Sequence, residues 1–199
     1  VLQQFLWPFV RVSAMLLTAP VFGANAVNVR VRVGIGAMIT LLIFQQVEHP
    51  NIDLFSFPAI AYMFNELAVG ALMGLVLQVV AAAIILSGQI VAGGMGLGMA
   101  QMIDPNLGNI PILSNFFLIL GLLVFLMLGG HLVLISVLLE SFASLPIGRG
   151  FLSLTTIESF VSWSSNIFIG AVSLVLPILL SLLMINVCLG IIGRASPSF

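Results

Sequence analysis

Residues Ile60–Pro111 read IAYMFNELAVGALMGLVLQVVAAAIILSGQIVAGGMGLGMAQMIDPNLGNIP. The first part, Ile60–Leu86, is a continuous apolar run, and about 20 such residues suffice to cross a bilayer as a helix. The second part, Ser87–Pro111, has too much glycine for a plain spanning helix, because each interior Gly costs about 0.5–1 kcal/mol relative to Ala. It is also too apolar for a soluble loop. This combination predicts a tightly packed, deformable segment that lines a passage able to open and close.

The composition of the whole chain points to a membrane. Of its 199 residues, 61% are hydrophobic and 6% are charged, whereas a soluble domain carries about 25% charged residues. The apolar runs are long and continuous, unlike the alternating segments of a membrane β-barrel, so we expect an all-α integral membrane protein. Lysine is absent and the formal net charge is −1, which gives no basic face for nucleic acid.

Apolar runs divide the chain into candidate helices of a single domain covering residues 1–199. We expect the third run to form a helical hairpin that bends near Ser87–Gly88 or Gly93–Gly94, and a loop from Glu140 to Glu158. Pro177 predicts a kink in the last run, because proline removes a backbone donor. The five runs are Leu2–Phe22, Val33–Val47, Ile60–Leu86, Ile112–Leu139 and Ile167–Ile192.

Glu66, Gly70 and Gly74 recur at a spacing of four, which places them on one face of a helix. Glycines at this spacing let a second helix approach closely. We interpret the three residues as a packing face, with a buried carboxylate in a proton path as the alternative. The same spacing of small residues recurs at Gly94 and Gly98.

Two charged or polar residues interrupt apolar runs. Arg11 costs roughly 2.5–3.5 kcal/mol at the centre of a membrane helix, so we expect it either to reach an interface or to pair with a carboxylate. His131 follows two glycines in the fourth run, and no second histidine lies at ligand spacing. We interpret it as a hydrogen-bonded packing residue, with a metal or proton role as the alternative.

Met95, Met99 and Met102 recur at spacings of four and three. Unbranched thioether side chains adapt to irregular gaps, so these residues either pack within a helix or form a flexible seal across a pore. Asp104-Pro105 then stops the helix, since the residue before proline disfavours helical geometry. The short loop that follows lies in an otherwise lipid-compatible region, where irregular backbone is tolerated only inside protein or beside a cavity.

Catalytic signatures are missing from the sequence. The glycine run is not a dinucleotide fingerprint, and neither HExxH nor GxSxG occurs. We therefore predict a protein that is not an enzyme and has no cofactor or metal. A secondary transporter or channel subunit that uses Glu66, Arg11 and His131 as its ion-coupled site is the alternative function, because transporters of that class have broken helices.

The order of motifs resembles the FliR family of flagellar export-gate proteins and its relatives in virulence type III secretion systems. Each motif alone is weak, but their order and spacing through the whole chain are specific. The motifs are FVRVSAMLLTAPVFG followed by VNVRVRVGIGAMIT, NELAVGALMGLV, SGQIVAGGMGLGMAQMIDP, GGHLVLISVLLESFASLPIG and LPILLSLLMINVCLGIIGRASP. The family continues after the sequence that corresponds to Arg194–Pro197, so we expect its C-terminal part to be missing here.

The resemblance implies an export-gate subunit with bent helices and helical hairpins, packed within a hetero-oligomeric assembly. One copy would join several copies of FliP and FliQ, with FlhB and FlhA as further partners. The assembly would lie in the bacterial inner membrane at the flagellar basal body, in contact with lipid, and would conduct unfolded export substrates. The resemblance also implies a methionine-lined constriction, contributed mainly by FliP.

By position, the resemblance places a pore plug on the loop that follows the Asp-Pro turn. Met95 and Met99 would then be candidates for lining the pore. The plug residues would be Met102, Ile103, Asp104, Pro105, Asn106, Leu107, Gly108, Asn109, Ile110, Pro111 and Ile112.

Overall fold

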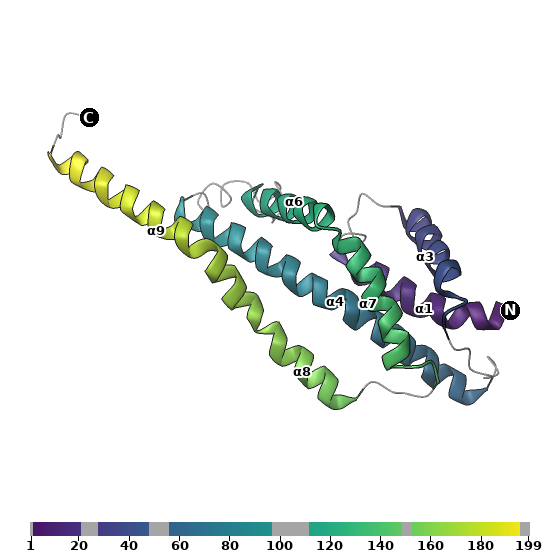
Figure 1. Ribbon diagram of the computed structural model, residues 1–199. Coiled ribbons are helices and arrows are strands. Elements are labelled where there is room, and N and C mark those ends of the chain that lie inside the picture. Colours follow the sequence, from purple (N-terminus) through teal and green to yellow (C-terminus); the bar gives the residue numbers. More distant parts are fainter. Residues whose placement is uncertain (1, 21–27, 48–55, 97–111, 149–152, 196–199) are drawn as a thin grey trace. The chain divides into compact units, whose positions relative to one another are not determined.

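The computed structural model describes residues 2–20, 28–47, 56–96, 112–148 and 153–195, and within these ranges it contains helices and turns but no strand (Figure 1). The prediction of an all-α fold is confirmed. The helices are α1 (Leu2–Thr18), α3 (Val29–Ile43), α4 (Phe57–Gly94), α6 (Ile112–Met127), α7 (Gly130–Ser144), α8 (Leu154–Ser164) and α9 (Asn166–Ala195).

The chain divides into two compact units. The first unit combines Val1–Val79 with Val124–Ser164, and the second combines Val80–Leu123 with Ser165–Phe199. Helices α4 and α6 each contribute to both units. Whether the chain acts as a single domain, as the sequence predicts, stays a prediction.

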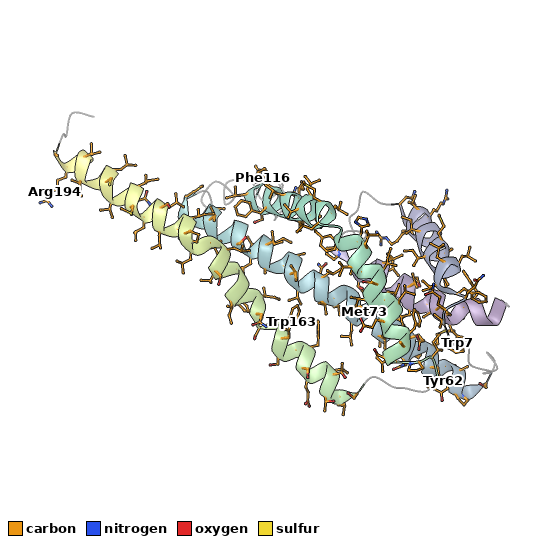
Figure 2. The ribbon with its side chains drawn as sticks, in the orientation of Figure 1. Trp7, Tyr62, Met73, Phe116, Trp163 and Arg194 are labelled. Carbon is orange, nitrogen blue, oxygen red and sulfur yellow. The ribbon has the colours of Figure 1, made fainter. Side chains whose placement is uncertain are left out.

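The first unit has a core of large side chains. Trp7, Met15 and Leu16 of α1 are buried together with residues from α7 and from the turn that follows it. Tyr62 of α4 packs against this core from its edge (Figure 2). The other buried members of the core are Val12, Ile43, Val47, Ala59, Leu138, Phe142 and Ile147.

Helix α3 packs on α1 through one narrow face. Its start is capped by Asn28, whose side-chain oxygen accepts a hydrogen bond from the backbone N–H of Arg30 at 3.2 Å. Gly36, Thr40 and Ile43 are the buried residues of this helix, and their spacing matches one helical face. The remaining apolar side chains of α3, such as Leu42, are exposed.

The second unit is packed through small residues. Its buried side chains include Ala81 and Val91 of α4 and Ala171 and Val175 of α9. A methyl carbon placed on Gly94 would lie 3.1 Å from Cδ2 of Leu179, so α9 lies close to the end of α4. Small side chains allow helices to approach closely enough for backbone contact, which is how membrane helices associate without a hydrophobic driving force.

Helix α4 continues through Ser87–Gly88, so the expected bend at that position is wrong. The helix ends at Gly94, which corresponds to the second expected position, and Gly96 follows with a φ of +75°. Glycine adopts this left-handed geometry without steric cost and commonly terminates helices. The uninterrupted length of α4, 38 residues, follows from the run of apolar residues that contains no proline after Pro58.

The fourth apolar run is broken at Gly129 and Gly130. Helix α6 ends at Met127, Gly129 has a φ of +72°, and α7 begins at Gly130. A methyl carbon on Gly130 would overlap the ring of Phe125. The ring therefore occupies the space that a side chain at this position would need.

The helices after the α6–α7 break differ from the sequence expectations in the extent of the predicted loop. The sequence predicts a loop over Glu140–Glu158, but α7 continues to Ser144 and Leu154–Ser164 forms α8. Helix α9 runs from Asn166 to Ala195 with Pro177 inside it, and the kink at Pro177 stays a prediction. The hydroxyl of Ser181 donates to the carbonyl oxygen of Pro177 at 2.9 Å.

Candidate functional site

Arg11 and Glu66 form an ion pair inside the first unit. Arg11 lies in the middle of α1 and Glu66 in the first third of α4, and both side chains are fully buried. The Nε atom of Arg11 donates to Oε2 of Glu66 at 2.6 Å. Of the two sequence alternatives for Arg11, the structure has the buried pair with a carboxylate.

The two terminal nitrogens of Arg11 reach the end of α7. Nη1 donates to the carbonyl oxygen of Ser141 at 3.0 Å and to its hydroxyl oxygen at 3.2 Å, and Nη2 donates to the carbonyl oxygen of Leu145 at 2.8 Å. The last carbonyls of a helix lack partners within the helix and carry partial negative charge. The guanidinium therefore both caps α7 and offsets its dipole.

A ring completes the surroundings of the guanidinium. The Cζ atom of Arg11 lies 4.3 Å from the ring centroid of Phe142, which is cation–π geometry. The planar guanidinium thus donates hydrogen bonds from all three nitrogens and presents one face to an aromatic ring, an arrangement that lysine cannot reproduce. One side chain connects α1, α4 and α7.

Gly70 and Gly74 lie against α1, on the same face of α4 as Glu66. A methyl carbon on Gly70 would overlap the carbonyl oxygen of Arg11, and one on Gly74 would overlap the hydroxyl of Thr18. That hydroxyl also lies 3.3 Å from the carbonyl oxygen of Ala71, to which it donates. The glycines bring the two helices close enough for Arg11 and Glu66 to meet.

Two buried polar atoms near the ion pair make no hydrogen bond among the described residues. Within the described ranges, Oε1 of Glu66 and Nε1 of Trp7 are buried and have no hydrogen-bond partner. Trp7 precedes Arg11 by one helical turn on α1. The cluster therefore retains one unused acceptor and one unused donor.

His131 is not a partner of the pair. It lies at the start of α7, ten residues before Ser141, which corresponds to about 15 Å along a helix axis. Its Nδ1 atom is buried and has no hydrogen-bond partner in the described part of the chain. The structure thus brings together two of the three residues of the alternative ion-coupled site, and leaves the third apart.

The remaining predicted residues fall near or inside a stretch that the structure does not describe. Gly94 ends α4, Met95 follows it and is half exposed, and Ile112 is the exposed first residue of α6. Residues 97–111 lie outside the described residues, and with them Gly98, Met99 and the plug residues Met102–Pro111.

Sequence reasoning missed the partners of Arg11 on α7. Two of the three acceptors, on Ser141 and on Leu145 just after α7, are main-chain carbonyl oxygens, which leave no signature in a sequence. It also missed a close contact between Gly88 of α4 and Ser114 of α6, where a methyl carbon on the glycine would lie 2.5 Å from Cα of the serine. The sequence indicates Gly88 only as a possible bend.

Several helices have the length and composition of membrane spans. Pro58–Gly94 and Leu154–Ala195 are each apolar and long enough to cross a membrane, and α6 with α7 would make a third span if the bent pair is counted as one. Many of their large apolar side chains are exposed. Among the described residues of α9, only Ala171 and Val175 are buried. This surface suits lipid or other apolar protein.

Comparison with known families shows a match over nearly the whole chain. The sequence profile described as "Bacterial export proteins, family 1" matches residues 2–199. The chain belongs to this family. The resemblance that its motifs indicate is therefore confirmed.

Individual members of the export family align with nearly all of this chain. A protein of Pectobacterium carotovorum described as "Flagellar biosynthetic protein FliR" is 37% identical over 196 residues, covering 98% of this chain and 75% of the relative. Proteins with the same description from Escherichia coli and Bacillus subtilis are 34% and 28% identical over 197 residues. This chain covers 76% of each of them.

Proposed function

We propose that this chain is a subunit of the flagellar type III export gate and forms part of the protein-conducting channel in the bacterial inner membrane, at the flagellar basal body. Its partners in this role are FliP and FliQ, with FlhB and FlhA acting in the same apparatus. The match of the export family to residues 2–199 carries the proposal. The relatives named as flagellar biosynthetic proteins favour the flagellar system.

The lengths of the apolar helices support a role inside a larger assembly. Helix α4 has 38 residues, which at 1.5 Å per residue is about 57 Å, whereas the hydrocarbon core of a bilayer is about 30 Å thick. The part that extends beyond the lipid is still apolar, so protein must cover it. Neighbouring gate subunits are suited to provide that cover.

In this function the channel is closed by a steric plug and not by chemistry. The plug is the segment Met102–Ile112, whose last residue begins α6, and an unfolded substrate displaces it during export. Methionines near it, including Met95 and Met99, line the adjoining constriction, because flexible thioether side chains can conform to different passing chains. No residue of the chain performs a covalent step.

The other predicted residues support the closed channel by packing its helices together or by allowing the backbone to bend. Glu66, Gly70 and Gly74 hold α4 against α1, and Gly94 and Gly98 allow close packing around the end of α4. Arg11 keeps the first unit together through its ion pair. The break before His131 and the helix that contains Pro177 are the positions at which the backbone is able to bend.

Deletion of Asn106–Pro111 in the assembled complex tests the plug. We expect a complex of unchanged mass that leaks ions or small dyes from vesicles in the absence of substrate. An unchanged leak with intact assembly would contradict the plug assignment. The mass of the purified complex tests membership separately: a mixed assembly with one copy of this chain supports it, whereas solute uptake by the isolated chain would favour a transporter.

A further inference from the structure

Helix α3 has an open apolar side opposite the side that packs on α1. On the packed side, a methyl carbon placed on Gly36 would lie 3.4 Å from Cδ1 of Leu16 of α1. On the other side, a methyl carbon on Gly34 would have no atom within 4 Å. The large side chains that share this other side with Gly34 are each more than half exposed, and their spacing places them on one helical face. They are Val31, Met38, Leu41 and Leu42, which we call the outer face of α3.

Two arginines lie in the first turn of α3, where the helix itself does not favour positive charge. Arg30 and Arg32 are the second and fourth residues of the helix, and the N-terminal end of a helix carries positive partial charge. Cations stabilise the opposite end of a helix, which is the position of Arg194 in the last turn of α9. The helix dipole therefore does not account for Arg30 and Arg32.

Neither arginine has a counter-charge among the described residues. The ion pair in this part of the chain joins Arg11 to Glu66, and no described carboxylate lies within 4 Å of the side-chain nitrogens of Arg30 or Arg32. The side chain of Arg30 is exposed, whereas Nε of Arg32 is buried and has no hydrogen-bond partner in the described ranges. A buried donor without a partner is costly, so an anion from outside the chain would satisfy both its hydrogen bond and its charge.

The length of α3 suits one leaflet of a bilayer. Its 15 residues extend about 22 Å, which is less than the hydrocarbon thickness of about 30 Å. The helix is thus too short to cross the membrane, but its apolar side can lie against acyl chains while its basic end lies among the headgroups. Figure 1 shows α3 beside α1 at one margin of the first unit, where lipid can reach it.

We propose that the outer face of α3, together with Arg30 and Arg32, binds an anionic phospholipid. The guanidinium groups attract the phosphate and can bind its oxygens with two parallel hydrogen bonds, and the acyl chains lie along the outer face. The apolar residues beside the two charges favour a lipid over a free phosphate ion, which would gain nothing from them. The inference extends the proposed function by naming a lipid that this subunit recognises, and it involves neither the plug nor the pore.

The test measures lipid contact at α3 in the assembled complex. The purified complex in detergent is illuminated with phosphatidylglycerol that carries a diazirine on one acyl chain, and peptide mass spectrometry locates the crosslinks. Phosphatidylcholine with the same diazirine is the uncharged control lipid. The variants are Arg30→Gln with Arg32→Gln, Arg30→Lys with Arg32→Lys, and Arg194→Gln as the matched control for loss of a cation elsewhere.

We expect phosphatidylglycerol to crosslink to Val31–Leu42 and phosphatidylcholine to crosslink there much less. The double glutamine variant should lower crosslinking by about 25-fold, since each arginine near an anionic membrane surface contributes roughly five-fold. The double lysine variant should keep most of the crosslinking, because lysine retains the charge and loses only the bidentate geometry. Arg194→Gln should crosslink at α3 like the parent.

Four results would overturn the lipid site. Equal crosslinking by the two lipids would mean that the outer face meets bulk lipid without recognising charge. The absence of crosslinks from both lipids in an intact complex would mean that protein covers the face. Competition by inorganic phosphate as strong as that by unlabelled phosphatidylglycerol would identify a phosphate site. Crosslinking that does not fall as salt is raised would exclude an electrostatic role for the arginines, and this measurement needs no variant.

The mass of the complex keeps this inference separate from the proposed function. A chain that does not enter a mixed assembly contradicts its role as a gate subunit, whatever lipid it binds. Lost crosslinking at Val31–Leu42 in a complex of unchanged mass contradicts the lipid site alone.

Discussion

Nε of Arg11 lies 2.6 Å from Oε2 of Glu66, across 55 residues of sequence. The same guanidinium donates to the carbonyl oxygens of Ser141 and Leu145, which are 130 and 134 residues from Arg11 in the sequence. A charge that is costly in lipid is thereby satisfied entirely within the protein. The ion pair and its hydrogen bonds therefore connect α1, α4 and the end of α7 within the first unit.

Substitutions of Arg11 distinguish the contribution of its charge from that of its hydrogen-bonding geometry. Arg11→Lys keeps the charge, but one ammonium group cannot serve the carboxylate and two carbonyls in their present positions. We expect a loss of about 2 kcal/mol of stability, the typical value of hydrogen bonds to a charged group. Arg11→Ala should cost about 3–5 kcal/mol, because it leaves Glu66 buried and unpaired. Thermal unfolding of the purified complex in detergent measures both effects.

Exchanging the two charges will not restore stability. In Arg11→Glu with Glu66→Arg the ion pair can re-form, but the carboxylate at position 11 faces the carbonyl oxygens of Ser141 and Leu145, which accept and do not donate. We expect the double variant to unfold at a lower temperature than the parent. Full rescue would show that the ion pair, and not the cap on α7, determines the stability.

The packing of α4 on α1 predicts strong position dependence among glycines. Gly70→Ala brings a methyl group onto the backbone of Arg11 and within 2.9 Å of Cβ of Ala14. We expect it to lower stability by about 1–3 kcal/mol, the usual cost of overpacking. Gly34→Ala in α3 is the matched control, since no atom lies within 4 Å of its added methyl group. It should stabilise the helix by about 0.5–1 kcal/mol.

At the break between α6 and α7, we predict that substitutions of Gly130 and Phe125 have coupled effects on stability. Gly130→Ala places a methyl group into the ring of Phe125, so we expect lower thermal stability. Phe125→Leu should recover part of that loss by removing the ring. A double-mutant cycle measures the coupling. Additive effects of the two substitutions would mean that the ring does not fill this space in the assembled protein.

Sequence reasoning succeeded where a physical pattern is local. The apolar runs predicted most helices, because burial in lipid or protein requires continuous apolar residues. Helix α8 was missed because serine, threonine and glutamate interrupt its apolar residues. Its signal was the N-terminal cap, where the hydroxyl of Ser153 accepts from the backbone N–H of Thr156 at 3.2 Å.

The candidate site was less predictable because its contacts are not local. The spacing of Glu66, Gly70 and Gly74 indicated a shared face, but it did not show that α1 lies on that face. Nothing in the sequence near Arg11 distinguishes a carboxylate partner from a membrane interface. Two of the three acceptors at the end of α7 are main-chain carbonyl oxygens, so only the fold brings them to the guanidinium.

The single cysteine of the chain offers a test of what covers α9. Cys188 is free and exposed on the C-terminal part of this helix, among apolar residues that no other described residue buries. If lipid or partner subunits cover that surface in the assembled gate, a membrane-impermeant maleimide should label Cys188 slowly in native membranes and rapidly after unfolding in detergent. Cys188→Ser, which removes the chain's sole thiol, corrects for background. Equally rapid labelling in both states would place this part of α9 in water and contradict the proposed assembly.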